Sequence, residues 1–63
     1  MNEYTILDYT TINHTKVFIG YKSKTIATWL VINNHISNIR FYYNIHIADN
    51  DYYNRIASIT VCA

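Results

Sequence analysis

The sequence has no proline, only one glycine and only one cysteine, Cys62. A single cysteine excludes an intrachain disulfide. The three histidines lie more than ten residues apart, with no cysteine at ligand spacing, so a structural zinc site is not expected. One glycine is also too few for the glycine-rich loops that hold phosphate groups. We therefore expect neither a metal nor a cofactor.

Charged residues are scarce as well. They make up 14% of the chain, with a formal net charge of +1, whereas average domains carry about 25%. The five basic residues are scattered and form no stripe of the kind that phosphate backbones require. The longest apolar run, Ile26–Ile32, is too short for a membrane span, and the N-terminal residues lack the pattern of a secretory signal. We therefore expect a cytoplasmic protein without a membrane segment.

The small size of the chain limits its core. Its 63 residues suffice for a single domain, 1–63, near the lower limit for a self-sufficient core. Ordering costs about 1.5 kcal/mol per residue, which nearly cancels the gain from a core of this size. Without a disulfide or a metal, self-association or a partner is the expected way to complete the core.

The clearest pattern in the chain is an alternation of apolar and polar residues over Asn38–Ala48. Apolar side chains fall on every second position: Ile39, Phe41, Tyr43, Ile45 and Ile47. Mostly polar side chains lie between them: Arg40, Tyr42, Asn44 and His46. A period of two residues is typical of a β-strand with one buried face. We therefore predict a strand over Asn38–Ala48.

Three earlier segments are also rich in β-forming residues. We predict strands over Glu3–Thr10, Lys16–Lys22 and Thr25–Ile36, with turns at Asn13–His14 and Ser23–Lys24. A two-residue turn at Ser23–Lys24 brings several residues opposite one another: Tyr21 and Ile26, Ile19 and Thr28, Val17 and Leu30, Phe18 and Trp29, Gly20 and Ala27. Both faces of this hairpin are then apolar, so both require cover. Gly20 is expected to leave room for the nearby ring of Trp29.

A final strand is predicted after a turn at Asp49–Asp51. A three-residue loop there keeps apolar residues opposite one another better than a two-residue loop does. This register places Tyr43 and Tyr53 in the core and leaves Tyr42 and Tyr52 on an open face. The predicted fold is all-β: a small five-strand antiparallel meander or a partly closed barrel.

Two helical alternatives compete with this interpretation. A helix over about 24–36 places Ile26, Trp29 and Leu30 on one stripe and gives an α+β fold in ββαββ order. The β-branched residues of this segment oppose it. A helix starting at Asp51 places Tyr52, Ile56 and Ile59 on one side, but the Ile-Thr-Val sequence near its end favours a strand.

The predicted sheet provides two sets of candidate binding residues. The open face of the final hairpin predicts a partner-binding set: Arg40, Tyr42, Asn44, His46 and Tyr52. The two-sided apolar hairpin predicts an oligomer interface: Phe18, Trp29 and Val31. Tyrosine suits such surfaces because it provides a broad ring and a hydroxyl group.

Catalysis is not expected. The chain has four acidic residues, Glu3, Asp8, Asp49 and Asp51, and none is paired in a way that indicates acid–base chemistry. We expect a non-enzymatic protein-binding protein: a homo-oligomer, most simply a dimer, that occludes a partner protein. Frequent isoleucine, asparagine and tyrosine, which have A/T-rich codons, are consistent with an inhibitor from a phage or another mobile element. The alternative is a single-stranded nucleic-acid-binding β module, which stacks bases on aromatic side chains.

Overall fold

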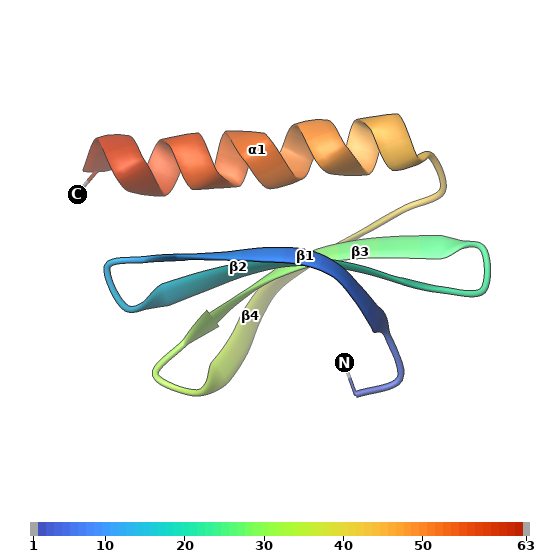
Figure 1. Cartoon of the computed structure of the whole chain (residues 1–63), viewed down its shortest axis with the longest axis horizontal. Helices are drawn as coiled ribbons and strands as arrows, with labels where there is room; N and C mark the ends of the chain where they lie inside the picture. The colour runs from blue at the N-terminus through green and yellow to red at the C-terminus, as the bar shows by residue number, and fades with distance from the viewer. Residues whose placement is uncertain (1, 63) are drawn as a thin grey trace.

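The computed structural model describes residues 2–62 as one antiparallel sheet and one helix. The strands are β1 (Thr5–Ile12), β2 (Thr15–Lys22), β3 (Thr25–Ile32) and β4 (His35–Tyr42), and the helix is α1 (Ile45–Cys62). The strands lie side by side in chain order. The helix crosses one face of the sheet, and the N-terminal turn curls towards the other side (Figure 1). The fold is predominantly β, but the all-β prediction of five strands is wrong, because the chain forms four strands and a helix. The presence of a helix agrees in part with the α+β alternative.

The three hairpin turns have two residues each, and their backbone angles explain the choice of residues. Both residues have positive φ at Asn13–His14, with φ of 48° and 69°, and at Asn33–Asn34, with φ of 52° and 65°. This geometry matches the right-handed twist of the strands, and asparagine tolerates it well. At Ser23–Lys24 only Ser23 has positive φ. The turns predicted at Asn13–His14 and Ser23–Lys24 are confirmed.

The register of the central hairpin is also as predicted. Phe18 pairs with Trp29 and Gly20 with Ala27, and the other three predicted pairs are present as well. Because a two-residue turn fixes the pairing, the alternation of each strand determines which side chains share a face. The alternative helix over 24–36 is wrong, since Thr25–Ile32 is a strand.

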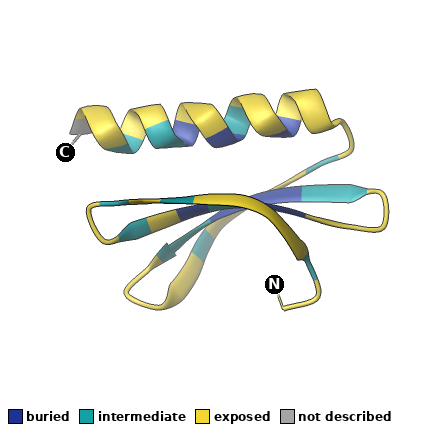
Figure 2. Ribbon diagram, in the orientation of Figure 1, coloured by how far each residue is buried: buried dark blue, intermediate teal, exposed yellow. Residues whose placement is uncertain are grey.

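The core lies between this sheet and the helix. Val17 and Ile19 of β2 pack against Ala48 and Tyr52 of α1, and all four are almost completely buried. Figure 2 shows the buried parts of the helix turned towards the sheet. The small side chain of Ala48 lets the helix approach the strands closely. The hydroxyl groups of Tyr52 and Thr10 lie 2.9 Å apart and link the helix to β1.

The strand predicted over Asn38–Ala48 is correct only in its first half. It begins earlier, at His35, and ends at Tyr42, and a helix follows from Ile45. The Asn44 side chain caps this helix, because its Oδ1 accepts hydrogen bonds from the backbone N–H groups of His46 at 2.9 Å and Ile47 at 3.4 Å. The loop predicted at Asp49–Asp51 and the fifth strand are therefore wrong.

Helical periodicity explains this outcome. The helix residues that contact the core are spaced by three or four positions: Ala48, Tyr52, Ile56 and Ile59. The alternative helix at Asp51 gave the correct side for the last three, but placed the helix start six residues too late. The predicted core positions of Tyr43 and Tyr53 are wrong, since both side chains are exposed.

Each outer strand contains a bulge. In β1 the register shifts between Ile6 and Asp8, so that Leu7 is an extra residue. In β4 the register shifts opposite Trp29, where Asn38 has a left-handed backbone with φ of 53°. A bulge moves the next side chains to the opposite face of the sheet relative to strict alternation. Residues three positions apart therefore share a face in both outer strands.

Gly20 lies in contact with Trp29, as expected. A Cβ atom at position 20 would lie 2.9 Å from the Cη2 atom of Trp29 and 2.9 Å from the carbonyl oxygen of Thr5. Contacts this short require either the indole ring or the neighbouring strand to move. The absence of a side chain at Gly20 is therefore a packing requirement.

We predict that Gly20→Ala lowers the free energy of unfolding by about 2 kcal/mol, because overpacking displaces Trp29 and β1. Urea unfolding measures the loss of stability. Trp29 is the only tryptophan, so its fluorescence emission reports movement of the ring directly. Unchanged stability together with an unchanged emission spectrum would contradict this packing role.

Candidate protein-interaction face

The sheet face that points away from the helix is the candidate functional site. We call it the open face from here on, and it is a different surface from the open face predicted for the final hairpin. Val17 and Ile19 point to the helix, so Phe18 and Gly20 between them point to the opposite side. The strand pairings extend this face to Tyr9 in β1 and to Trp29 in β3.

An aromatic row crosses the middle of the open face. The rings of Tyr9 and Phe18 are stacked with centroids 5.5 Å apart, and those of Phe18 and Trp29 with centroids 5.4 Å apart. Tyr4, from the N-terminal turn, meets Trp29 edge-on at 6.0 Å. Such pairs stabilise the sheet beyond the simple burial of area. Because its neighbours cover it, Trp29 is only 3% exposed.

Around this row lie apolar side chains that remain open to solvent. The pairing of Ile6 with Gly20, of Ile36 with Val31 and of Phe41 with Ala27 places all three on the open face. The exposed apolar residues of the open face are between 42% and 58% exposed: Ile6, Tyr9, Ile36, Ile39 and Phe41. Exposed apolar residues are common singly, but a contiguous group indicates an interaction site.

The two bulges assemble this group. Strict alternation predicts opposite faces for Ile6 and Tyr9, but the extra residue Leu7 brings both to the open face. The bulge at Asn38 does the same for Ile36 and Ile39. A sequence pattern with a period of two residues cannot reveal such pairs, which is why these residues were missed.

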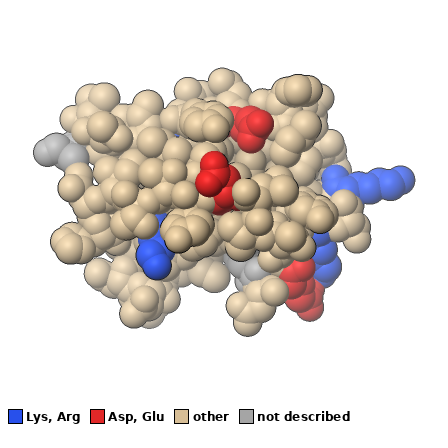
Figure 3. Space-filling view, viewed as in Figure 1, with Lys and Arg blue, Asp and Glu red and all other residues tan. Residues whose placement is uncertain are grey.

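Charged groups lie towards the ends of the open face. On β2, alternation places Lys16 and Lys22 on the same side as Phe18. Lys22 forms an ion pair with Glu3, so its charge is locally balanced. Figure 3 views the molecule from the side, with the helix above the sheet, and shows charged atoms as separate spots among uncharged ones. The centre of the open face is therefore aromatic and aliphatic, with cations towards its ends.

The three residues predicted for an oligomer interface meet on the open face. Phe18 and Val31 are partly buried, and Trp29 lies beneath its neighbours. The predicted pairing of Phe18 with Trp29 is confirmed. Their participation in an interface stays a prediction. The exposed residues of β1 and β4 extend the candidate surface beyond these three.

The predicted partner-binding set is not brought together as one surface. Arg40 and Tyr42 lie on the helix side of β4, because they pair with Thr28 and Ile26. Asn44 caps α1, and His46 lies in its exposed first turn. The expected placement of Tyr52 on an open face is wrong: its side chain is 1% exposed and forms part of the core. Burial raises the pKa of the Tyr52 hydroxyl.

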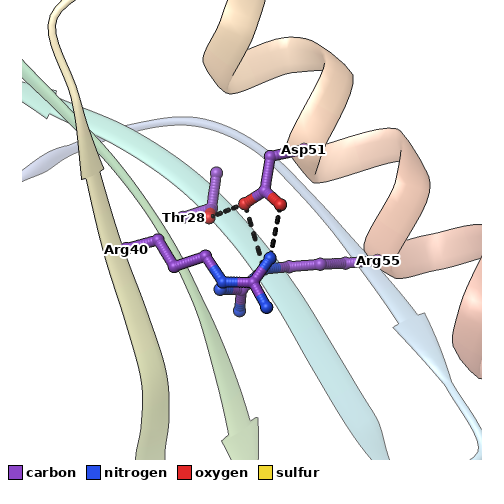
Figure 4. Close-up of polar contacts among 4 residues, drawn as sticks. All are labelled: Thr28, Arg40, Asp51 and Arg55. Atoms are coloured by element: carbon purple, nitrogen blue, oxygen red, sulfur yellow. Dashed lines mark hydrogen bonds and ion pairs between the residues drawn. The ribbon is translucent and has the colours of Figure 1, made fainter.

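A polar cluster around Asp51 fastens the helix to β3 and β4. The Asp51 carboxylate accepts hydrogen bonds from the Thr28 hydroxyl at 2.6 Å, from Arg40 Nη1 at 2.6 Å and from Arg55 Nε at 3.1 Å. Figure 4 shows these groups converging on the carboxylate. The three donors come from β3, β4 and the helix itself. Asp51 is thus the polar link between the two layers of the fold.

The electrostatics of this cluster favour ionised Asp51. Burial alone raises the pKa of Asp51, but the hydrogen bonds from Thr28, Arg40 and Tyr42, together with the charge of Arg55, outweigh it, and the net pKa lies below its ordinary value. Arg55 is 7% exposed, and its Nη1 and Nη2 atoms are buried without a protein hydrogen-bond partner. Removal of the carboxylate would leave this arginine as an unpaired buried charge, which is costly. The hydrogen bonds of the cluster join α1 to β3 and β4, which is a structural role.

Two other kinds of site, a metal centre and a membrane-spanning helix, are not found in the described part of the chain. The described side chains of residues 2–61 include no group of three or more histidine, cysteine, aspartate or glutamate residues placed to hold a metal ion. The side chain of Cys62 lies outside the described residues. Among the described residues, no helix is both long enough and apolar enough to cross a membrane. Comparisons with protein-family models, curated proteins and solved structures found no match.

We predict that Asp51→Asn lowers the free energy of unfolding by about 3 kcal/mol, since it leaves the buried Arg55 without a counter-charge. Asp49→Asn is the matched control, because Asp49 lies in the same helix but is exposed. Urea unfolding followed by circular dichroism compares the two variants. Equal stability of both variants would contradict the anchoring role of Asp51.

The same carboxylate predicts a dependence of stability on pH. Because the folded state lowers the pKa of Asp51 from 3.8, its ionised form stabilises the fold above that value, and the contribution is lost as the pH falls further. The difference in stability between the wild type and Asp51→Asn should therefore narrow as the pH falls below about 3.8. Unfolding measured across this range tests the prediction. A difference that stays constant into acid would show that ionisation of Asp51 does not contribute.

Proposed function

We propose that this chain is a non-enzymatic protein-binding protein that docks apolar protein surfaces on its open face. The observation that supports this function most directly is the group of exposed apolar residues that β1 and β4 place on the same face, on both sides of the aromatic row. Aromatic and aliphatic side chains with few charges are characteristic of the centres of protein interfaces. The polar cluster at Asp51 is engaged in holding the fold together and leaves the open face as the candidate surface.

Occlusion of a partner is the mode of action that fits a chain of this size. A sheet of four strands presents a broad, shallow surface, and such a surface masks an area on its partner without enclosing a small molecule. An inhibitor that blocks a functional surface acts in this way. We propose this mode for the chain, including the expectation of an inhibitor carried by a phage or another mobile element.

A second candidate function is single-strand nucleic-acid binding. It is favoured by the position of Lys16 and Lys22 on the same strand and the same face as Phe18, since such proteins combine basic groups with aromatic stacking platforms. However, the rings of Phe18 and Trp29 already stack on each other, with an interplanar angle of 5°. Lys22 is also paired with Glu3. These two observations favour a protein partner.

Site-specific photo-crosslinking tests the proposed function. A benzophenone amino acid at position 41, on the open face, is compared with the same group at position 53, on the helix. Position 53 is a matched control for position 41, because Phe41 and Tyr53 are both aromatic and are 58% and 60% exposed. We expect the probe at position 41 to form protease-sensitive adducts with polypeptide in cells that carry the gene, at a several-fold higher yield than the probe at position 53.

Other results would exclude this function. Adducts at position 41 that are sensitive to nuclease would support nucleic-acid binding. Equal yields at positions 41 and 53 would show that the open face is not the docking surface. Absence of any adduct at position 41 would contradict both functions.

A further inference from the structure

We infer that the partner seated on the open face is a second copy of this chain, so that two sheets pack face to face in a symmetric dimer. This inference rests on the proposed function and names the occupant of the same face. A second copy and a foreign partner would compete for this face, so occlusion of a foreign partner would require the dimer to dissociate. Three properties of the face support it: its area, its charge distribution and its exposed apolar residues.

The area of the open face is adequate for a dimer. Each strand has eight residues, which gives a length of about 26 Å, and four strands at about 4.8 Å spacing give a width of about 19 Å. Two such faces together present about 1,000 Å² in projection, and side-chain relief adds to it. Specific interfaces start at about this area. The dimer would therefore need nearly the whole open face, including the part where Tyr4 already covers Trp29.

The charge distribution allows the face to meet its own copy. A symmetric interface places the same patch of both subunits together, so a centre with charges of one sign would repel itself. Here the centre contains Phe18, Gly20 and Trp29, and Lys22 is neutralised by Glu3. Recognition of a partner of opposite charge would instead require an unpaired charged side chain in the centre of the open face.

The folded chain also leaves the burial of its apolar residues incomplete. The helix side of the sheet contains the core, whereas Ile6, Tyr9 and Phe41 on the other side remain exposed. Two sheets packed about 10 Å apart would interdigitate these side chains and form a second apolar layer. The assembly would then have four layers: helix, sheet, sheet and helix. The open face would become an interior, and each α1 would lie on the outside.

Sedimentation velocity of the full chain at increasing micromolar concentrations tests the dimer. We expect the wild type to sediment with twice the chain mass of 7.4 kDa. Phe41→Glu places two like charges within the apolar interface and should raise the dimer dissociation constant at least ~100-fold. Ile47→Glu is the matched control, because Ile47 is 56% exposed and lies in the helix. This control should remain a dimer.

A second variant keeps the test valid if Phe41→Glu does not fold. Tyr9→Glu introduces the same charge on the opposite outer strand, at a residue that is 57% exposed. Circular dichroism identifies which variants keep the native spectrum, and dissociation of either folded variant supports the dimer. The inference would be overturned if the wild type stays monomeric. It would also be overturned if Phe41→Glu and Ile47→Glu have equal dimer dissociation constants.

The two experiments separate the inference from the proposed function. If the wild type is monomeric but position 41 still forms adducts with another polypeptide, the second copy is not the occupant and the protein-binding function stands. If position 41 forms no adducts and the wild type is monomeric, both fail.

Discussion

A four-stranded sheet with two apolar faces must be covered on both sides, and this chain supplies one helix. The helix settles on the face that carries Val17 and Ile19, where Ala48 allows close approach and Asp51 fixes the orientation. The opposite face is left with stacked aromatic rings and a partial cover from Tyr4. The division of the sheet into a covered and an uncovered face determines where the core lies and where binding is proposed.

Local information in the sequence was sufficient for the first two strands and for the central hairpin. The strand predicted over Thr25–Ile36 was too long, because it ends at Ile32 and the Asn33–Asn34 turn follows. Two-residue turns such as Ser23–Lys24 fix the register over short distances, and alternation then assigns Phe18 and Trp29 to one face. The helix was missed because Ile45 and Ile47 continue the two-residue alternation of β4 past its end. The opposing signals were the N-cap at Asn44 and the spacing of Ala48, Tyr52, Ile56 and Ile59. Tertiary packing decided between these two periods.

The candidate site was predictable to the same extent as the fold. The two-sided apolar hairpin gave Phe18, Trp29 and Val31, which share the open face. The predicted partner-binding set depended on a fifth strand. Because that segment is a helix, these residues lie on different surfaces, and Tyr52 is part of the core. The exposed pairs created by the bulges, such as Ile6 with Tyr9, depend on an irregularity in the ladder that no residue pattern announces.

The bulges in the two outer strands have a consequence for how the molecule avoids aggregation. An outer strand exposes a row of unpaired backbone groups, which is a template on which further chains can add as strands without limit. Leu7 in β1 and Asn38 in β4 interrupt that row on both edges of the sheet. Growth by edge-to-edge strand addition is thereby disfavoured. Contact between two faces uses up both adhesive surfaces at once, so it ends with a finite assembly and does not continue into a fibre.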